Sequence, residues 1–166
     1  MKKIVVLGAG ESGTGSALLA RKKGFDVFVS DIGQIKEKYK AVLEKNHIRY
    51  EEAKHTMDEI LSGDEVIKSP GIHDSSSLVV QIREKGIPVI SEIEFAGRFA
   101  EGIKICVTGS NGKTTVTNLI YHILKKAGKK VAMTGNVGKS FAEAVAEGGY
   151  DYYVIDLSSF QLDGMY

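Results

Sequence analysis

The sequence has a single cysteine among its 166 residues, so it lacks both a disulfide framework and a cysteine cluster of the kind that binds metal ions. It also lacks an excess of one charge: 22 basic residues face 21 acidic ones, and no net field favours nucleic acid or an anionic membrane. No stretch approaches the ~18 apolar residues of a membrane span. The apolar run at residues 4–7 is followed by glycines and no small-residue cleavage site, which argues against a signal peptide. We therefore expect a soluble, cytoplasmic protein.

Short β-branched runs alternate with segments of helical periodicity, a pattern typical of an α/β fold with a mostly parallel sheet. Strands are expected at residues 4–7, 27–30, 48–50, 65–67 and 89–90, helices at 12–23, 36–45 and 78–85, and a connecting helix at 93–101. The pattern restarts at Lys104, with strands at 105–107, 130–133 and 152–156 and helices at 114–126 and 141–147. We expect a Rossmann-like domain over residues 1–92 and the beginning of a P-loop ATPase-type domain over 93–166. Because a P-loop domain normally needs more than three strands, we expect a truncated chain.

The first glycine-rich loop, Gly8 to Gly13, matches G-x-G-x-x-G between a predicted strand and a predicted helix. Its glycines allow a tight turn, close approach of the backbone to a diphosphate, and close packing of the helix on the strand. The helix N-terminus adds free N–H groups that suit phosphate. Asp31 ends the second strand, where its carboxylate can accept hydrogen bonds from a ribose or a base. The motif predicts a dinucleotide or nucleotide-diphosphate site but does not separate NAD from other diphosphates, and a purely structural turn is the alternative.

The second glycine-rich loop is more specific and indicates ATP. Its residues are Gly109, Ser110, Asn111, Gly112, Lys113, Thr114 and Thr115, between an apolar strand and a helix. Successive N–H groups of such a loop surround phosphates, Lys113 places a charge near the transferred group, and Thr114 offers a hydroxyl to Mg²⁺. Asp156 ends a later apolar strand, where an acid in a P-loop protein lies near the metal ion. Cys106, within the strand before this loop, is expected to be a small buried apolar residue.

Five motifs together resemble the Mur ligase family, over the whole chain. They are G-A-G-E-S-G at 8–13, S-P-G-I at 69–72, G-S-N-G-K-T-T at 109–115, G-N-V-G at 135–138 and D-L-S-S-F-Q-L at 156–162. The paired serines before Phe160 are most similar to those of the members that add D-glutamate. The resemblance implies an ATP- and Mg²⁺-dependent ligase that joins D-glutamate to UDP-N-acetylmuramoyl-L-alanine during synthesis of peptidoglycan precursors, without nucleic-acid or membrane partners.

The resemblance also implies where the ligands bind. The uridine diphosphate part of the substrate, rather than NAD, is expected on the first domain, and ATP on residues 109–115. Substrate-binding residues implied by the family are Gly10, Glu11, Ser12, Gly13, Asp31, Ser69, Pro70, Gly71, Asn136, Ser158 and Gln161, of which the last three face the muramoyl-alanine end. Lys113 and Asn136 are implied as catalytic residues, and Thr114 and Asp156 as metal ligands.

The implied mechanism transfers the γ-phosphoryl group of ATP to the L-alanyl carboxylate, and the amine of D-glutamate then attacks the acyl phosphate. Lys113, Mg²⁺ and the loop N–H groups would offset charge on the moving phosphoryl group. The family also uses a histidine, a modified lysine and a C-terminal domain that this chain does not contain. We therefore expect the chain to bind ligands without turnover.

The sequence departs from the family at three places. Asp156 stands where glutamate is usual, which leaves open a metal contact through water. Val137 replaces an isoleucine, and Ile32 and Gly33 offer no polar side chain to uracil. Two other hypotheses remain: a nicotinamide-dependent oxidoreductase, which leaves the P-loop unexplained, and a nucleotide-binding module without catalysis.

The second predicted array also leaves apolar residues without partners. Leu119, Ile123, Phe160 and Leu162 are expected to face water, because only three strands and two helices are available to cover them. Such patches and open strand edges favour association. The sequence therefore predicts that residues 1–92 are well ordered, and that the rest of the chain either self-associates through the incomplete second domain or is poorly ordered.

Overall fold

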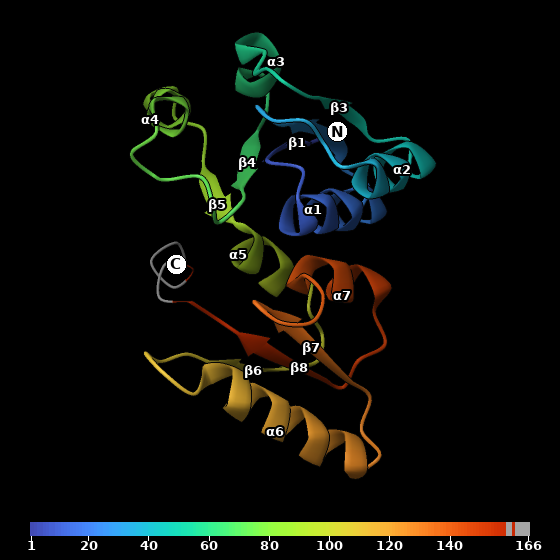
Figure 1. Cartoon of the computed structure of the whole chain (residues 1–166). Coiled ribbons are helices and arrows are strands. Elements are labelled where there is room, and N and C mark those ends of the chain that lie inside the picture. Colours follow the sequence, from blue (N-terminus) through green and yellow to red (C-terminus); the bar gives the residue numbers. More distant parts are fainter. Residues whose placement is uncertain (159–160, 162–166) are drawn as a thin grey trace.

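A computed structural model describes residues 1–158 and 161, and it confirms the alternation of strands and helices (Figure 1). The first part contains β1 (Lys3–Leu7), α1 (Glu11–Lys22), β2 (Asp26–Ser30), α2 (Glu37–Lys45), β3 (Arg49–Glu51), α3 (Met57–Leu61), β4 (Glu65–Lys68), α4 (Ser77–Glu84), β5 (Val89–Ser91) and α5 (Glu92–Gly97). The second part contains β6 (Ile103–Val107), α6 (Lys113–Lys126), β7 (Val131–Gly135), α7 (Phe141–Glu147) and β8 (Tyr152–Asp156). Helix α3 was not predicted, because five residues are too few to show a helical period.

The strands form two parallel sheets. The first has the order β3-β2-β1-β4-β5 and the second β6-β8-β7. In the first sheet the chain moves outward from β1 to β3 and then returns to pair β4 with the other side of β1. Ligands of such open α/β sheets bind at the carboxyl ends of the strands where the order reverses. The topology therefore predicts a ligand site at the carboxyl ends of β1 and β4, which are Leu7 and Lys68.

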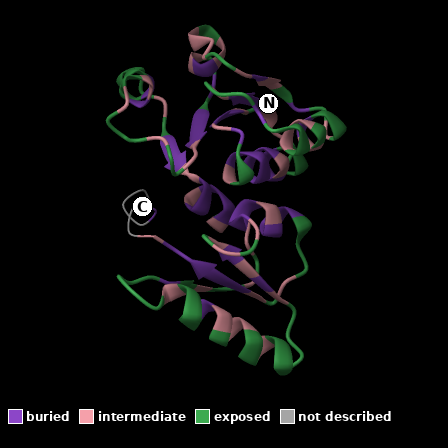
Figure 2. Cartoon of the chain, viewed as in Figure 1, coloured by how far each residue is buried: buried purple, intermediate pink, exposed green. Residues whose placement is uncertain are grey.

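The apolar residues form two clusters on opposite faces of the first sheet. On one face, Val5 and Phe28 pack with Ile60 of α3 and with Val79 and Ile82 of α4. The cluster on the other face continues beyond this sheet. It contains residues of α1 and α2, then of α5 and α7, and finally Tyr153 and Ile155 of β8. Helices α5 and α7 thus lie between the sheets, and the buried residues run through them without a break (Figures 1 and 2). The domain division at residue 92 stays a prediction.

The outer face of α6 is open to solvent (Figure 2). Leu119 is 59% exposed and Ile123 is 57% exposed, as the sequence predicted. Phe160 and Leu162 lie outside the described residues. The prediction for Cys106 was wrong: its side chain is exposed, on β6, which is an edge strand of the described sheet. No described helix has the length and apolar character needed to cross a membrane.

Candidate nucleotide and substrate site

The first glycine loop is held in place by Asp31, the residue that follows β2. The Asp31 carboxylate accepts hydrogen bonds from Ala9 N–H (2.6 Å) and from Gly33 N–H (2.8 Å). Gly13 shows why the loop needs glycine, since a Cβ at this position would lie 1.8 Å from the Gly8 carbonyl oxygen. Asp31 therefore shapes the loop and still keeps carboxylate lone pairs for a ligand.

A cavity of about 410 Å³ opens beside this loop, at the end of the first sheet that the topology indicates. Its lining includes Gly8, Gly10, Asp31 and Ser69, together with His55. Ser69 is fixed there by its N–H, which donates to the Leu7 carbonyl at 3.0 Å. The structure thus brings three of the predicted substrate-binding residues, Gly10, Asp31 and Ser69, into one hollow. Pro70 and Gly71 are exposed and do not line it.

Two other predicted residues of this loop lie elsewhere. Glu11 lines a separate cavity of about 800 Å³ between α1, α2 and β7, which contains no other predicted site residue. The Ser12 side chain lies near the buried carboxyl group of Glu92 at the start of α5, where it opposes the rise that burial causes in the pKa of that group. Ser12 therefore has a partner within the protein that the sequence pattern did not indicate.

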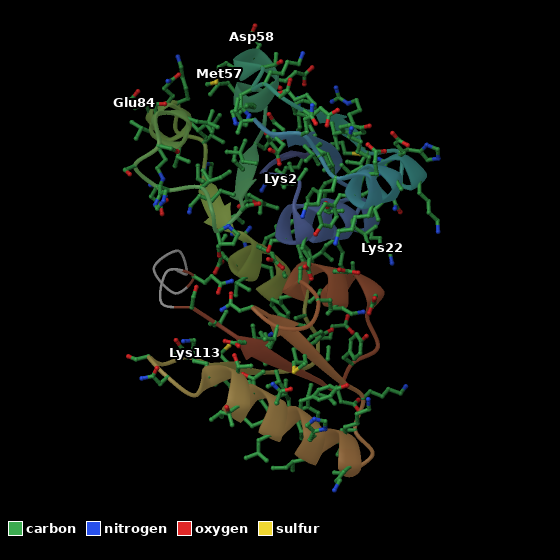
Figure 3. All side chains as sticks on the ribbon, in the orientation of Figure 1. Lys2, Lys22, Met57, Asp58, Glu84 and Lys113 are labelled. Atoms are coloured by element: carbon green, nitrogen blue, oxygen red, sulfur yellow. The ribbon has the colours of Figure 1, made fainter. Side chains whose placement is uncertain are left out.

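The second glycine loop leads into α6, and Lys113 lies at the start of that helix (Figure 3). The Lys113 ammonium donates a hydrogen bond to the Gly109 carbonyl at 2.6 Å. Ser110, Asn111, Gly112 and Thr115 are exposed around it. The loop is open to solvent, and a phosphate oxygen can replace the Gly109 carbonyl as the acceptor for Lys113.

Asp156 lies next to this loop and is only 1% exposed. Its Oδ2 accepts a hydrogen bond from the Thr114 hydroxyl at 3.0 Å, while its Oδ1 is buried without a hydrogen-bond partner among the described residues. An unpaired buried carboxylate oxygen is costly unless a cation or donor satisfies it. Carboxylate and hydroxyl oxygens are the ligands that Mg²⁺ prefers. The pair Thr114 and Asp156 therefore fits a Mg²⁺ ion beside bound phosphates.

The remaining predicted residues gather at the same end of the second sheet. The Asn136 N–H donates to the Asp156 carbonyl at 3.0 Å, so the loop after β7 is tied to the end of β8. Ser158 donates from its N–H (2.8 Å) and its hydroxyl (3.0 Å) to the Gln161 side-chain oxygen. The side-chain nitrogen of Gln161 remains for another acceptor. Asn136, Asp156 and Ser158 thus adjoin the P-loop.

Comparison with known proteins decides the family. A model of the MurD N-terminal domain matches residues 3–78, and a model of the Mur ligase middle domain matches residues 107–165. The chain belongs to the Mur ligase family. UDP-N-acetylmuramoylalanine--D-glutamate ligase of Bacteroides fragilis is 62% identical over the whole chain, and that of Porphyromonas gingivalis is 57% identical over 98% of it. The chain spans 37% and 36% of the length of these two relatives.

Solved structures of Mur ligases confirm the fold. The UDP-N-acetylmuramate:L-alanyl-gamma-D-glutamyl-meso-diaminopimelate ligase from Neisseria meningitides matches 94% of this chain and 52% of its own length, with a TM-score of 0.63 and 22% identity. A pseudomurein peptide ligase type C from Methanothermus fervidus matches 96% of this chain and 33% of its own length, with a TM-score of 0.57 and 24% identity. The Rossmann-like and ATPase-type arrangement predicted from the sequence is thereby confirmed.

Two polar residues at the first cavity and its surroundings were missed at the level of sequence. His55 lines the cavity, and Glu92 accepts a hydrogen bond from Ala142 N–H and lies near Ser12, on the helix between the sheets. Neither belongs to a motif, and neither lies near its partners along the chain. A search for polar residues after strand ends would have found Glu92, which directly follows β5, but no local signal marks His55.

Proposed function

We propose that this chain carries the UDP-substrate and ATP sites of a ligase that adds D-glutamate to UDP-N-acetylmuramoyl-L-alanine in the cytoplasm. The observation that supports this most is the presence of two separate phosphate loops in one chain, each at the carboxyl end of its own sheet. A nicotinamide-dependent oxidoreductase would need only the first loop. The D-glutamate ligases of the two named relatives are 62% and 57% identical to this chain over its matched length, which supports the same assignment.

In this proposal residues 1–92 form the UDP-substrate domain and residues 93–166 contain the ATP site. The phosphates of ATP lie on the loop from Gly109 to Thr115. Thr114 and Asp156 would hold Mg²⁺, which would supply positive charge to the phosphate oxygens when bound. Asp156 is one carbon shorter than the usual glutamate, and its unpaired Oδ1 would offer the ion a carboxylate oxygen.

The residues of the chain then bind and orient the reacting groups. Lys113 exchanges the Gly109 carbonyl for an oxygen of the γ-phosphoryl group and offsets its charge as it moves to the L-alanyl carboxylate. Asn136 is held next to Asp156 through its backbone, so its side chain is available to the muramoyl-alanine end of the substrate. The acyl phosphate formed on the substrate is the electrophile that the amine of D-glutamate attacks. The chain is proposed to bind these ligands, with turnover depending on the rest of the ligase.

A titration separates this proposal from the oxidoreductase hypothesis. Calorimetry with UDP-N-acetylmuramoyl-L-alanine and with NAD is expected to show tighter binding of the UDP ligand. Asp31→Ala should weaken that binding, because the glycine loop loses its hydrogen bond from Ala9 N–H to the carboxylate and the cavity loses an acceptor. Asp58→Ala is the matched control, since Asp58 is exposed on α3, away from the loop (Figure 3). Tighter binding of NAD would overturn the proposed function.

A further inference from the structure

A short chain of hydrogen bonds ends at the first cavity. Ser30, fully buried at the end of β2, lies between Glu51 at the end of β3 and His55 in the loop before α3. The Ser30 Oγ is 2.7 Å from Glu51 Oε1 and 2.7 Å from His55 Nδ1. The strand register brings Ser30 beside Glu51, so these contacts are built into the sheet.

The positions of the protons in this series of hydrogen bonds follow from the donors and acceptors of Glu51, Ser30 and His55. Glu51 is a carboxylate: burial raises its pKa, but hydrogen bonds from Thr56 and Ser30 outweigh burial and leave the pKa below its ordinary value. A carboxylate only accepts, so the single Ser30 hydroxyl proton points to Glu51. Ser30 Oγ must then accept from His55, which places a proton on Nδ1. In the neutral imidazole, Nε2 is left as a hydrogen-bond acceptor.

His55, which carries this acceptor, lines a cavity whose lining at that end is unsuited to phosphate. No described residue hydrogen-bonds Nε2, and His55 lines the cavity together with Asp31. A lone pair and a carboxylate both repel a phosphate oxygen and both attract N–H or O–H donors. Ile32, Ile72 and Leu78 line the same cavity and offer an apolar surface to a flat ring. The cavity thus combines apolar walls with acceptors, which suits a nucleobase that carries an N–H donor.

We propose that His55 is a specificity-determining residue whose Nε2 accepts a hydrogen bond from the imide N–H of a uracil-type base. The inference rests on the proposed function, which places a uridine diphosphate group on this domain. It supplies the polar base contact that Ile32 and Gly33 cannot make. In cytosine the same ring position carries a lone pair, so two acceptors would face each other and binding would weaken.

Nucleotide titrations followed by NMR test this on the full chain, with UDP and CDP as probes. Both share the ribose and the diphosphate, so their ratio isolates the base. The wild-type chain is expected to bind UDP about tenfold more tightly than CDP, the effect of one unfavourable polar contact. His55→Phe keeps a flat ring without an acceptor and should reduce the ratio of the UDP affinity to the CDP affinity to about one. His55→Gln returns an acceptor near the position of Nε2 and should restore part of it.

A control variant and a direct measurement of the His55 tautomer complete the test. His122→Phe changes an exposed histidine on α6 and should leave both affinities unchanged. Long-range ¹H–¹⁵N spectra of the free wild-type chain report the tautomer directly and do not depend on any variant folding. They should show the proton of neutral His55 on Nδ1, and a proton on Nε2 would overturn the inference.

The inference and the proposed function fail in different ways. If the chain binds UDP but His55→Phe keeps the preference over CDP, the inference is overturned and the proposed function stands. If His55→Phe weakens the binding of UDP and of CDP equally, His55 contacts the ribose, and the inference about the base is also overturned. If NAD binds more tightly than UDP-N-acetylmuramoyl-L-alanine, the proposed function is lost and the inference with it.

Discussion

At the scale of single residues, Lys113 is the simplest test of the ATP site. Its ammonium lies at the surface of the P-loop and bonds one backbone carbonyl, so the fold depends on it little. Lys113→Ala should weaken binding of MgATP by about tenfold or more, because a hydrogen bond from a charged group contributes ~1.5–3 kcal/mol. The free energy of unfolding should change by no more than about 0.5 kcal/mol. Calorimetry and urea unfolding measure the two effects.

The matched control is Lys126→Ala, at the opposite end of α6, where the side chain is exposed. It removes the same charge without touching the loop and should leave MgATP binding unchanged. Undiminished binding by Lys113→Ala would show that the loop does not hold the phosphates through this side chain.

At the scale of elements, the contact between α1 and α7 holds the two sheets together. A Cβ on Gly15 would lie 2.1 Å from Ser140 Oγ and 3.0 Å from Glu143 N, so the helices touch at this glycine. Gly15→Ala should lower the free energy of unfolding by ~1–3 kcal/mol, the usual cost of overpacking. Gly97→Ala, where a Cβ meets nothing within 4 Å, should be neutral or slightly stabilising. Equal urea midpoints for both variants would contradict the close contact.

Glu92 links the same elements and predicts a dependence on pH. Burial raises the pKa of Glu92 above its ordinary value of 4.5, although hydrogen bonds from Ala142 N–H and from the Ser12 and Ser140 hydroxyls oppose the shift. The folded state therefore holds this proton more tightly than the unfolded state, and the free energy of unfolding falls as pH rises above about 4.5. Glu92→Gln removes this titration and keeps an acceptor for Ala142 N–H.

Urea unfolding of the wild type and of Glu92→Gln over a range of pH measures the effect. The stability of Glu92→Gln relative to the wild type should grow as pH rises above about 4.5. Glu84→Gln, at an exposed position on α4, provides a control whose difference from the wild type should show no such growth (Figure 3). A pH-independent difference for Glu92→Gln would mean that burial does not control this carboxyl group.

At the scale of the whole molecule, the outer face of α6 predicts self-association. Val116, Leu119 and Ile123 recur at helical spacing and are 45%, 59% and 57% exposed. Burying such a row against a second copy removes apolar area from water, at ~25 cal/mol per Å². Light scattering should show a mass that rises with concentration, and Leu119→Lys with Ile123→Lys should reduce it. Val80→Lys changes a single exposed apolar residue on α4 and is the control. A wild-type monomer at high concentration would contradict the prediction.

The sequence by itself determined the strand and helix order, both phosphate loops and the family, because each of these depends on residues close together in the chain. Periodicity located every element except α3, and the motifs around Gly8 and Lys113 lie within single strand–loop–helix units. These are local patterns, set by backbone geometry and by the needs of a phosphate group.

Only the tertiary structure decided which distant side chains meet. Ser30 contacts Glu51 and His55 because β3 pairs with β2 in register, and Glu92 reaches α7 because α5 packs between the sheets. Exposure also depended on the tertiary structure: Cys106 lies in an apolar strand, yet its side chain is exposed, on a strand that the sheet order places at an edge. Strand order and helix packing create these contacts and this exposure across long sequence separations, and neither composition nor spacing encodes them locally.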